Sequence, residues 1–205
     1  MDLGFNESQQ MLRNAAREFL ERECPASFVR AMEDDSMGYT PELWKNIAEL
    51  GWLGLPFPEE YGGLGLSYLD LTVLLEEMGR VLFPGAFFSS VILGGLTILA
   101  AGSASQKEEV LPGIAKGTTT ATLALMEPSV EYGPSGIQTR ASLQGSSYVI
   151  SGTKLFVPDA HSADILIVPA RTSEESDSSE GITLLLVDPV FWIEVCILVF
   201  FFLYL

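Results

Sequence analysis

Histidine, cysteine and basic side chains are all scarce in this chain of 205 residues, and each scarcity excludes a class of function. The two cysteines, Cys24 and Cys196, have no CxxC pairing and no neighbouring histidine, which excludes a structural zinc site on the number of ligands. The single histidine, His161, has no serine or cysteine arrangement around it that indicates nucleophilic catalysis. Because 11 basic residues face 27 acidic ones, the net charge of −16 has the wrong sign for a nucleic-acid partner.

The chain also lacks the features that direct proteins into or across membranes. Its start, MDLGFNESQQ, has neither a basic segment nor an apolar run, so we expect no secretory signal and a reducing, cytoplasmic location. Nineteen residues from 83 to 101 carry no charge, yet glycine, proline, serine and threonine dilute their apolar character. A buried helix with close-packing glycines is therefore expected there instead of a membrane span.

Helix signals dominate the first part of the chain. Capping residues stand before segments whose apolar residues recur at helical spacing, at Asn6, Thr40, Ser67 and Ser103. Proline follows Thr40 at the first helical position, where its missing amide costs nothing. These signals predict an all-helical domain over residues 1–117.

After Gly117 the pattern changes to short runs of period two with small and β-branched residues. Such runs predict strands at 118–125, 148–157, 163–170 and 181–189. The acidic and polar segment 172–181 is expected to be an exposed hairpin loop. A β domain is therefore predicted over residues 118–189.

Residues 124–159 read ALMEPSVEYGPSGIQTRASLQGSSYVISGTKLFVPD, with two turns rich in glycine and proline between short alternating strands. This stretch resembles the flavin-facing part of the acyl-CoA dehydrogenases, from their ALTEP-GSD-TxA type of motif through their GxKxWITN type. The resemblance continues upstream in GLPFPEEYGGLGLS at 54–67 and covers about residues 3–189. It implies an α+β chain in which an all-helical N-terminal domain precedes an antiparallel β-barrel-like middle domain. The resemblance also implies that the chain is truncated before the family's second helical domain.

The resemblance also implies which residues bind the cofactor FAD, namely Leu125, Met126, Phe156, Val157 and Pro158. Met126 stands where the family has a threonine, so an amide donor remains and a hydroxyl is lost. Phe156 replaces the tryptophan that covers the flavin ring, and Pro158 replaces a threonine that bonds the reactive nitrogen. The alternative is that Phe156 and Val157 are ordinary core residues of a strand and that Met126 fills a gap.

Glu131 and Tyr132 align with the family's GSD motif, whose serine lies near the thioester arm of CoA, so an acyl-CoA thioester is the implied substrate. The family's glutamate base lies beyond the middle domain, and no catalytic residue is assigned here. The implied function is α,β-dehydrogenation of acyl-CoA with FAD, by a chain that is inactive alone. The alternative is a non-catalytic partner subunit of a heteromeric acyl-CoA dehydrogenase. Homologous subunits, in a homo- or hetero-oligomer, are the expected partners in both cases.

Residues 190–205, VFWIEVCILVFFFLYL, form an atypical apolar tail that does not resemble the family. A membrane tail would be short, with eleven residues after Glu194, and a buried strand would be prone to aggregation unless covered. We favour a third explanation, that the tail is non-native sequence.

Overall fold

A computed structural model describes the chain from residue 4 to residue 189, except for residues 130, 132, 146 and 174–179. It divides into two compact units. The first comprises Met1–Phe88 and Ile98–Thr118, and the second comprises Ser89–Thr97 and Thr119–Leu205. The apolar tail, and with it the choice among its three explanations, lies outside the described residues.

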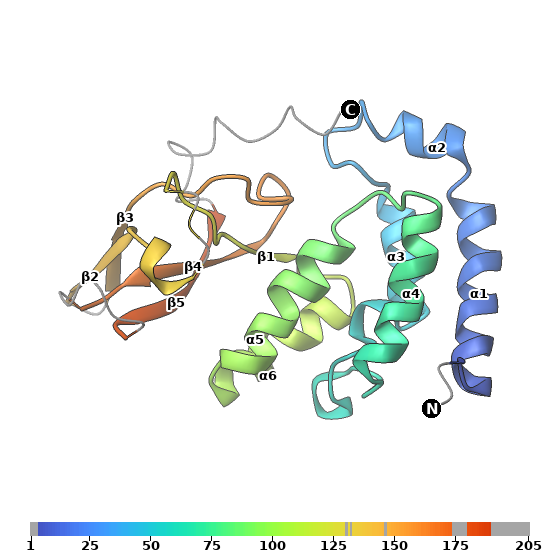
Figure 1. The fold of residues 1–205 in the computed structure, drawn as a ribbon, viewed down its shortest axis with the longest axis horizontal. Coiled ribbons are helices and arrows are strands. Elements are labelled where there is room, and N and C mark those ends of the chain that lie inside the picture. The colour runs from blue at the N-terminus through green and yellow to red at the C-terminus, as the bar shows by residue number, and fades with distance from the viewer. Residues whose placement is uncertain (1–3, 130, 132, 146, 174–179, 190–205) are drawn as a thin grey trace. The chain divides into compact units, whose positions relative to one another are not determined.

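Up to residue 115, the regular elements of the described chain are all helices or helical turns, with loops between them (Figure 1). They are α1 (Glu7–Glu23), α2 (Ala26–Ala31), α3 (Pro41–Glu49), the 3-10 turns η1 (Trp52–Gly54) and η2 (Glu59–Tyr61), α4 (Tyr68–Arg80), the π-helix η3 (Phe88–Gly95), α5 (Leu96–Ala101) and α6 (Ala104–Ala115). The predicted caps are confirmed. Side chains of Asn6, Ser67 and Ser103 form capping boxes, and Thr40 accepts a hydrogen bond from the Leu43 amide.

A buried carboxylate joins α1 to α4. Glu77 of α4 is 1% exposed, and its Oε1 lies 2.7 Å from Arg17 Nη2 and 3.1 Å from Arg13 Nε, both on α1. Its Oε2 lies 2.9 Å from Arg80 Nε. The hydrogen bonds from Arg17, aided by Arg13 and Arg80 and opposed by burial, lower the pKa of Glu77 from 4.5 to about 2. This carboxylate therefore stays ionised throughout the physiological range.

Within the uncharged stretch 83–101, where a single buried helix was expected, residues 88–101 form two consecutive helical pieces, η3 and α5. The predicted close packing of glycine is confirmed at Gly94, where an added Cβ would lie 2.6 Å from the Cβ of Ala121. Ser90 on the same π-helix accepts a hydrogen bond from the Ala121 amide at 3.3 Å. None of the described helices is long and apolar enough to span a bilayer.

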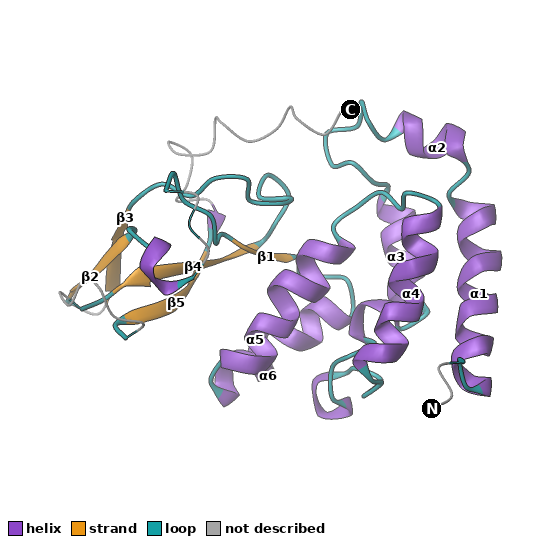
Figure 2. Ribbon diagram, viewed as in Figure 1, coloured by secondary structure: helices purple, strands orange, loops and turns teal. Residues whose placement is uncertain are grey.

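The second unit is built on a mixed sheet (Figure 2). Its strands are β1 (Ala121–Leu123), β2 (Arg140–Gln144), β3 (Ser147–Ser151), β4 (Ile165–Arg171) and β5 (Ile182–Val187). β4 runs parallel to β1, with Thr122 opposite Leu166, and antiparallel to β5, with Val168 opposite Leu185. β2 pairs antiparallel with β3 and meets β4 in parallel at Arg140.

This arrangement differs from the antiparallel, barrel-like sheet that was expected. The long connection between β1 and β4 permits their parallel pairing, which a short hairpin turn would not allow. The described strands form an open sheet. The expected hairpin between the last two strands is confirmed, and Thr172 closes its loop by donating its amide to the Gly181 carbonyl at 2.8 Å.

The strands also differ from expectation in their extent and number. The strand predicted at 148–157 ends at Ser151, and the next residue, Gly152, packs so closely on Thr139 that an added Cβ would lie 2.4 Å from the Thr139 hydroxyl oxygen. β2 was not among the predicted strands. Only Ala141 in its sequence RASLQ is buried, so no apolar alternation marks it.

Candidate functional site

Two segments that leave the sheet run next to each other and carry most of the residues expected at the flavin. One follows β1 and contains Leu125 and Met126, and the other follows β3 and contains Phe156. The Leu155 amide donates a hydrogen bond to the Met126 carbonyl at 2.8 Å, which fixes their register. The structure therefore brings together residues about 30 positions apart in sequence.

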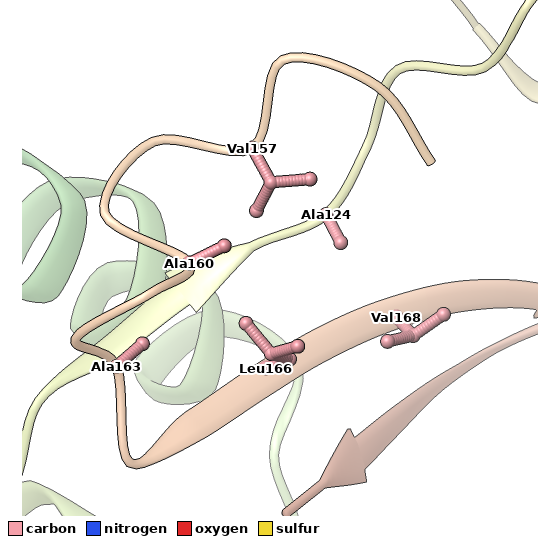
Figure 3. Packing of buried hydrophobic residues seen from close by; sticks show 6 residues of the cluster. All are labelled: Ala124, Val157, Ala160, Ala163, Leu166 and Val168. Carbon is pink, nitrogen blue, oxygen red and sulfur yellow. The ribbon is translucent and has the colours of Figure 1, made fainter. Parts of the chain in front are cut away.

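Side chains alternate between the core and the surface along both segments. Ala124 is fully buried and Leu125 is 39% exposed, while Phe156 is 65% exposed and Val157 is 2% exposed. Val157 lies close to Ala124 in the apolar cluster above β4, which Figure 3 shows. Leu125 and Phe156 thus form an exposed apolar face, whereas the side chain of Val157 belongs to the core beneath it.

A buried ion pair links the two segments that carry this exposed face. Lys154 Nζ lies 2.6 Å from Glu127 Oε1, and both side chains are almost completely buried. Glu127 also accepts hydrogen bonds from the amides of Gln138, at 2.7 Å to Oε2, and Thr139, at 3.1 Å. One carboxylate therefore connects three separate stretches of chain, two of which carry the exposed face.

Burial and pairing oppose each other in this ion pair. Burial alone would raise the pKa of Glu127, but the hydrogen bonds from Lys154 and from the two amides together hold it below its usual value. Burial lowers the pKa of Lys154, and the contact with Glu127 opposes that change. The Glu127 carboxylate is therefore occupied by its contacts with Lys154 and the two amides, and it is unsuited to accept a proton from a substrate.

A second buried cation holds the turn that contains the expected substrate residues. Arg171, 4% exposed, donates from Nε to the Ile137 carbonyl at 2.7 Å and from Nη2 to the Pro134 carbonyl at 2.8 Å. Gly136 allows the turn to close, because a Cβ there would lie 2.3 Å from the Glu131 carbonyl oxygen. Glu131 itself is exposed. Tyr132 lies outside the described residues.

The loop that carries Phe156 ends in a second polar contact. Pro158 is half-buried and has neither an amide proton nor a hydroxyl to offer a ligand. The next residue, Asp159, accepts a hydrogen bond on Oδ2 from the buried Ser89 hydroxyl at 2.5 Å. Backbone dihedrals in this loop are unusual, since Phe156 and Asp159 both have φ of +51°.

A separate hollow of about 500 Å³ opens elsewhere in the same unit. It is lined by residues of β3 and β5 together with Thr139, Gly152 and Lys154. No group of three or more histidine, cysteine, aspartate or glutamate side chains suited to a metal ion occurs in the described part of the chain.

Comparison with protein-family models now assigns both units. Residues 6–118 match the acyl-CoA dehydrogenase N-terminal domain, and residues 122–190 match the acyl-CoA dehydrogenase middle domain. The chain belongs to the acyl-CoA dehydrogenase family. The resemblance identified from the motifs is confirmed.

Individual acyl-CoA dehydrogenases give the same result, and this chain spans between about a third and a half of their length. The "Probable acyl-CoA dehydrogenase YngJ" of Bacillus subtilis is 32% identical over 190 residues, which cover 91% of this chain and 49% of that protein. The solved ChsE4-ChsE5 complex of Mycobacterium tuberculosis is 28% identical with a TM-score of 0.78, covering 93% of this chain and 49% of the other. An acyl-CoA dehydrogenase of Bacillus anthracis, solved in complex with FAD, is 28% identical with a TM-score of 0.77, covering 90% and 31%.

The flavin-binding and substrate-binding roles that the acyl-CoA dehydrogenase motifs assign stay predictions. The structure adds the positions of most of these residues. Leu125, Met126 and Phe156 lie on neighbouring segments, Val157 faces the core, and Pro158 follows directly. Sequence reasoning did not assign functional roles to the Glu127–Lys154 pair or to Ser89. The pair had a visible signal, because opposite charges stand inside both motifs, whereas nothing near Ser89 marks its contact with Asp159.

Proposed function

We propose that this chain forms the N-terminal and middle domains of an FAD-dependent acyl-CoA dehydrogenase, which catalyses α,β-dehydrogenation of acyl-CoA thioesters. The observation that carries the proposal is the exposed face of Leu125 and Phe156 on two segments that the motifs assign to the flavin. An aromatic side chain that is 65% exposed suits contact with a flat ring system.

The residues present fit the flavin ring better at its face than at its polar edge. Phe156 and Leu125 would cover the ring, and Met126 would lie at its pyrimidine edge. Pro158 can donate no hydrogen bond, so one family contact is replaced by a purely apolar one. FAD, when bound, supplies the acceptor for the hydride that leaves the β-carbon. Glu131, together with Tyr132, would lie near the thioester arm of the acyl-CoA.

Three carboxylates of the β unit, those of Glu127, Asp159 and Asp164, do not suit the role of catalytic base because each is already engaged in the fold. Glu127 is bound to Lys154, Asp159 to Ser89, and Asp164 accepts from the amide and hydroxyl of Thr120 at 2.8 and 2.9 Å. A base must be free to accept the α-proton of the substrate. We therefore expect that the 205 residues alone do not turn over acyl-CoA, and that homologous subunits complete the site.

The second candidate is a non-catalytic partner subunit of a heteromeric acyl-CoA dehydrogenase. Pro158 and Met126 favour it, because both replace a hydroxyl that would bind flavin. The ChsE4-ChsE5 structure, a complex of two different chains by its description, offers a precedent within the family. We further propose that additional strands close the open sheet into a barrel, and that the protein acts in the cytoplasm.

Native mass spectrometry of the protein isolated from its source tests these proposals together, since it reports assembly and bound cofactor at once. Binding of one FAD per copy of this chain supports the first candidate. A complex in which only a homologous partner carries FAD supports the second. An assembly without FAD and without an acyl-CoA dehydrogenase homologue would overturn both.

A titration of the purified chain with FAD locates the site. Phe156→Ala is expected to weaken binding about tenfold or more, because stacking against the ring is lost. Tyr148→Ala is the matched control, since Tyr148 is an aromatic residue 45% exposed on β3, outside the two motif segments. Equal weakening by both variants would contradict the assignment of Phe156.

A further inference from the structure

The loop from Leu155 to Ala160 adopts a conformation that its own residues disfavour. Three non-glycine residues of the described chain have positive φ, and two of them, Phe156 and Asp159, lie in this loop. Side chains with a Cβ rarely adopt such values, and they persist only where the surrounding structure holds them. Contacts outside the loop must therefore hold it.

The first contact lies at the start of the loop. Lys154 is paired with Glu127, and the Leu155 amide is bound to the Met126 carbonyl. These bonds fix the chain up to the residue before Phe156. They do not reach Asp159, which needs a separate support.

Ser89 provides that second support. Its hydroxyl donates to Asp159 Oδ2 at 2.5 Å, and Ser89 itself is 1% exposed. The Asp159 carbonyl in turn accepts the Ser162 amide at 3.0 Å, so the residue is held through both its side chain and its backbone.

The helix that presents Ser89 is itself fixed in place. Ser89 belongs to the π-helix η3, whose next residue, Ser90, accepts the Ala121 amide, and whose Gly94 packs directly on Ala121. π-Helical segments are rare in proteins and are found frequently at functional sites. The position of the Ser89 hydroxyl is therefore tied to β1, the strand that leads into Leu125.

We propose that Ser89 is a positioning residue for the flavin site: its hydrogen bond to Asp159 holds the loop in the left-handed conformation that presents Phe156 as a rigid face for the flavin ring. This rests on the proposed function, in which Phe156 covers the flavin. Without the bond, the backbone at Phe156 and Asp159 relaxes toward ordinary dihedrals and the ring swings away. A face held in place before binding avoids the ordering cost that a mobile one incurs.

Four variants separate the hydrogen bond from the backbone conformation. Ser89→Ala removes the donor, and Asp159→Ala removes the acceptor and disfavours positive φ. Asp159→Asn keeps an acceptor and a residue type that tolerates positive φ, so it should behave like the parent chain. Ser90→Ala is the matched control, because Ser90 is an equally buried serine on the same π-helix whose partner is Ala121.

Two measurements on the full chain are made for each variant. Hydrogen exchange of the peptide spanning 155–160, without flavin, is expected to accelerate about tenfold in Ser89→Ala and Asp159→Ala and to change less than twofold in the other two variants. The dissociation constant for FAD is expected to rise about tenfold in the same two variants, with a weakened visible circular dichroism of the bound flavin. The dichroism band of bound flavin reports how rigidly the surroundings of its ring are held. A general loss of stability would not weaken this band in the two predicted variants alone.

The outcomes distinguish this inference from the function on which it rests. If the parent chain binds FAD and Ser89→Ala binds it with the same affinity and the same dichroism, the inference is overturned and the proposed function stands. Equal exchange rates in Ser89→Ala and the parent chain would also overturn the inference. A parent chain that binds no FAD, alone or in its native assembly, would overturn the proposed function. Selective loss in the two predicted variants, with Asp159→Asn retained, supports the inference.

Discussion

Replacing Glu77 by glutamine should destabilise the helical unit in a way that depends on pH. The substitution keeps the shape of the side chain and removes the charge that pairs with Arg17, Arg13 and Arg80. The folded pKa of Glu77 is about 2, against an ordinary value of 4.5. Because folding lowers this pKa, the unfolded chain binds the proton more tightly, and ionised Glu77 favours the folded state.

The size of the effect follows from the pKa difference. A difference of about 2.5 units corresponds to about 3 kcal/mol, and solvent screening of the half-exposed arginines reduces it to about 2–3 kcal/mol. This contribution is complete above pH 4.5 or so and is lost as the pH falls toward 2. By pH 3 about two thirds of it should be gone.

Urea unfolding followed by tryptophan fluorescence measures this contribution. In a Trp192→Phe background the remaining tryptophans, Trp44 and Trp52, are both buried in the helical unit and report on it alone. The free energy of unfolding of Glu77→Gln should fall by about 2–3 kcal/mol at pH 7, and the difference from the parent should shrink at pH 4 and again at pH 3.

Glu76→Gln is the matched control for that experiment. Glu76 lies next to Glu77, but its side chain is 51% exposed and stands 3.8 Å from Arg13. Its replacement should cost less than about 0.5 kcal/mol at any pH. Equal stability of Glu77→Gln and the parent at pH 7, or a difference that does not change with pH, would refute the assignment of Glu77 as the charged centre of the network.

Three further predictions concern other parts of the chain. Glu127→Ala leaves Lys154 as a buried charge without its carboxylate, and should lower the free energy of unfolding by about 3–5 kcal/mol in chemical denaturation; a loss under 1 kcal/mol would contradict the ion-pair role. Phe156→Gly removes a side chain that is exposed and held at positive φ, so thermal unfolding should show unchanged or slightly higher stability, by up to about 1 kcal/mol, while the proposed FAD binding weakens about tenfold or more; a clear destabilisation would show that the ring is needed for folding. Burial, aided by Glu23, raises the pKa of Cys24 to about 11, so in a Cys196→Ser chain a disulfide reagent at pH 8 should react about 100-fold more slowly than with a free thiol, and a rate near that of the unfolded chain would disprove the burial.

Features that depend on neighbouring residues could be predicted from the sequence. Capping boxes at Ser67 and Ser103 join positions three residues apart, and both occur in the structure where the pattern placed them. The family assignment belongs to the same category, because its motifs are continuous in sequence and needed no knowledge of the fold.

Features that depend on distant residues could not be predicted in this way. The parallel pairing of β1 with β4 has no local signal, and β2 lacks the apolar alternation that marks a strand. Gly94 and Ser90 of the π-helix contact Ala121 of β1, and no helical periodicity reveals either contact. Leu125 and Phe156 were among the five residues assigned to FAD, an assignment that stays a prediction, but neither their exposure, nor the burial of Val157, nor the contacts that hold their segments could be read from the sequence.

The parallel pairing of β1 with β4 has a consequence for how the site forms. Ala121 pairs with Ile165, and the stretch between them contains both motif segments, both turns and the loop of Phe156. Joining those strands closes a loop of about 40 residues. The chain loses conformational entropy in that step, before the contacts inside the loop can stabilise it. Glu127 and Lys154 can form their buried ion pair only after that loop has closed. We therefore expect the exposed face of Leu125 and Phe156 to be acquired late in folding, and to be the first part lost when the β1–β4 ladder opens.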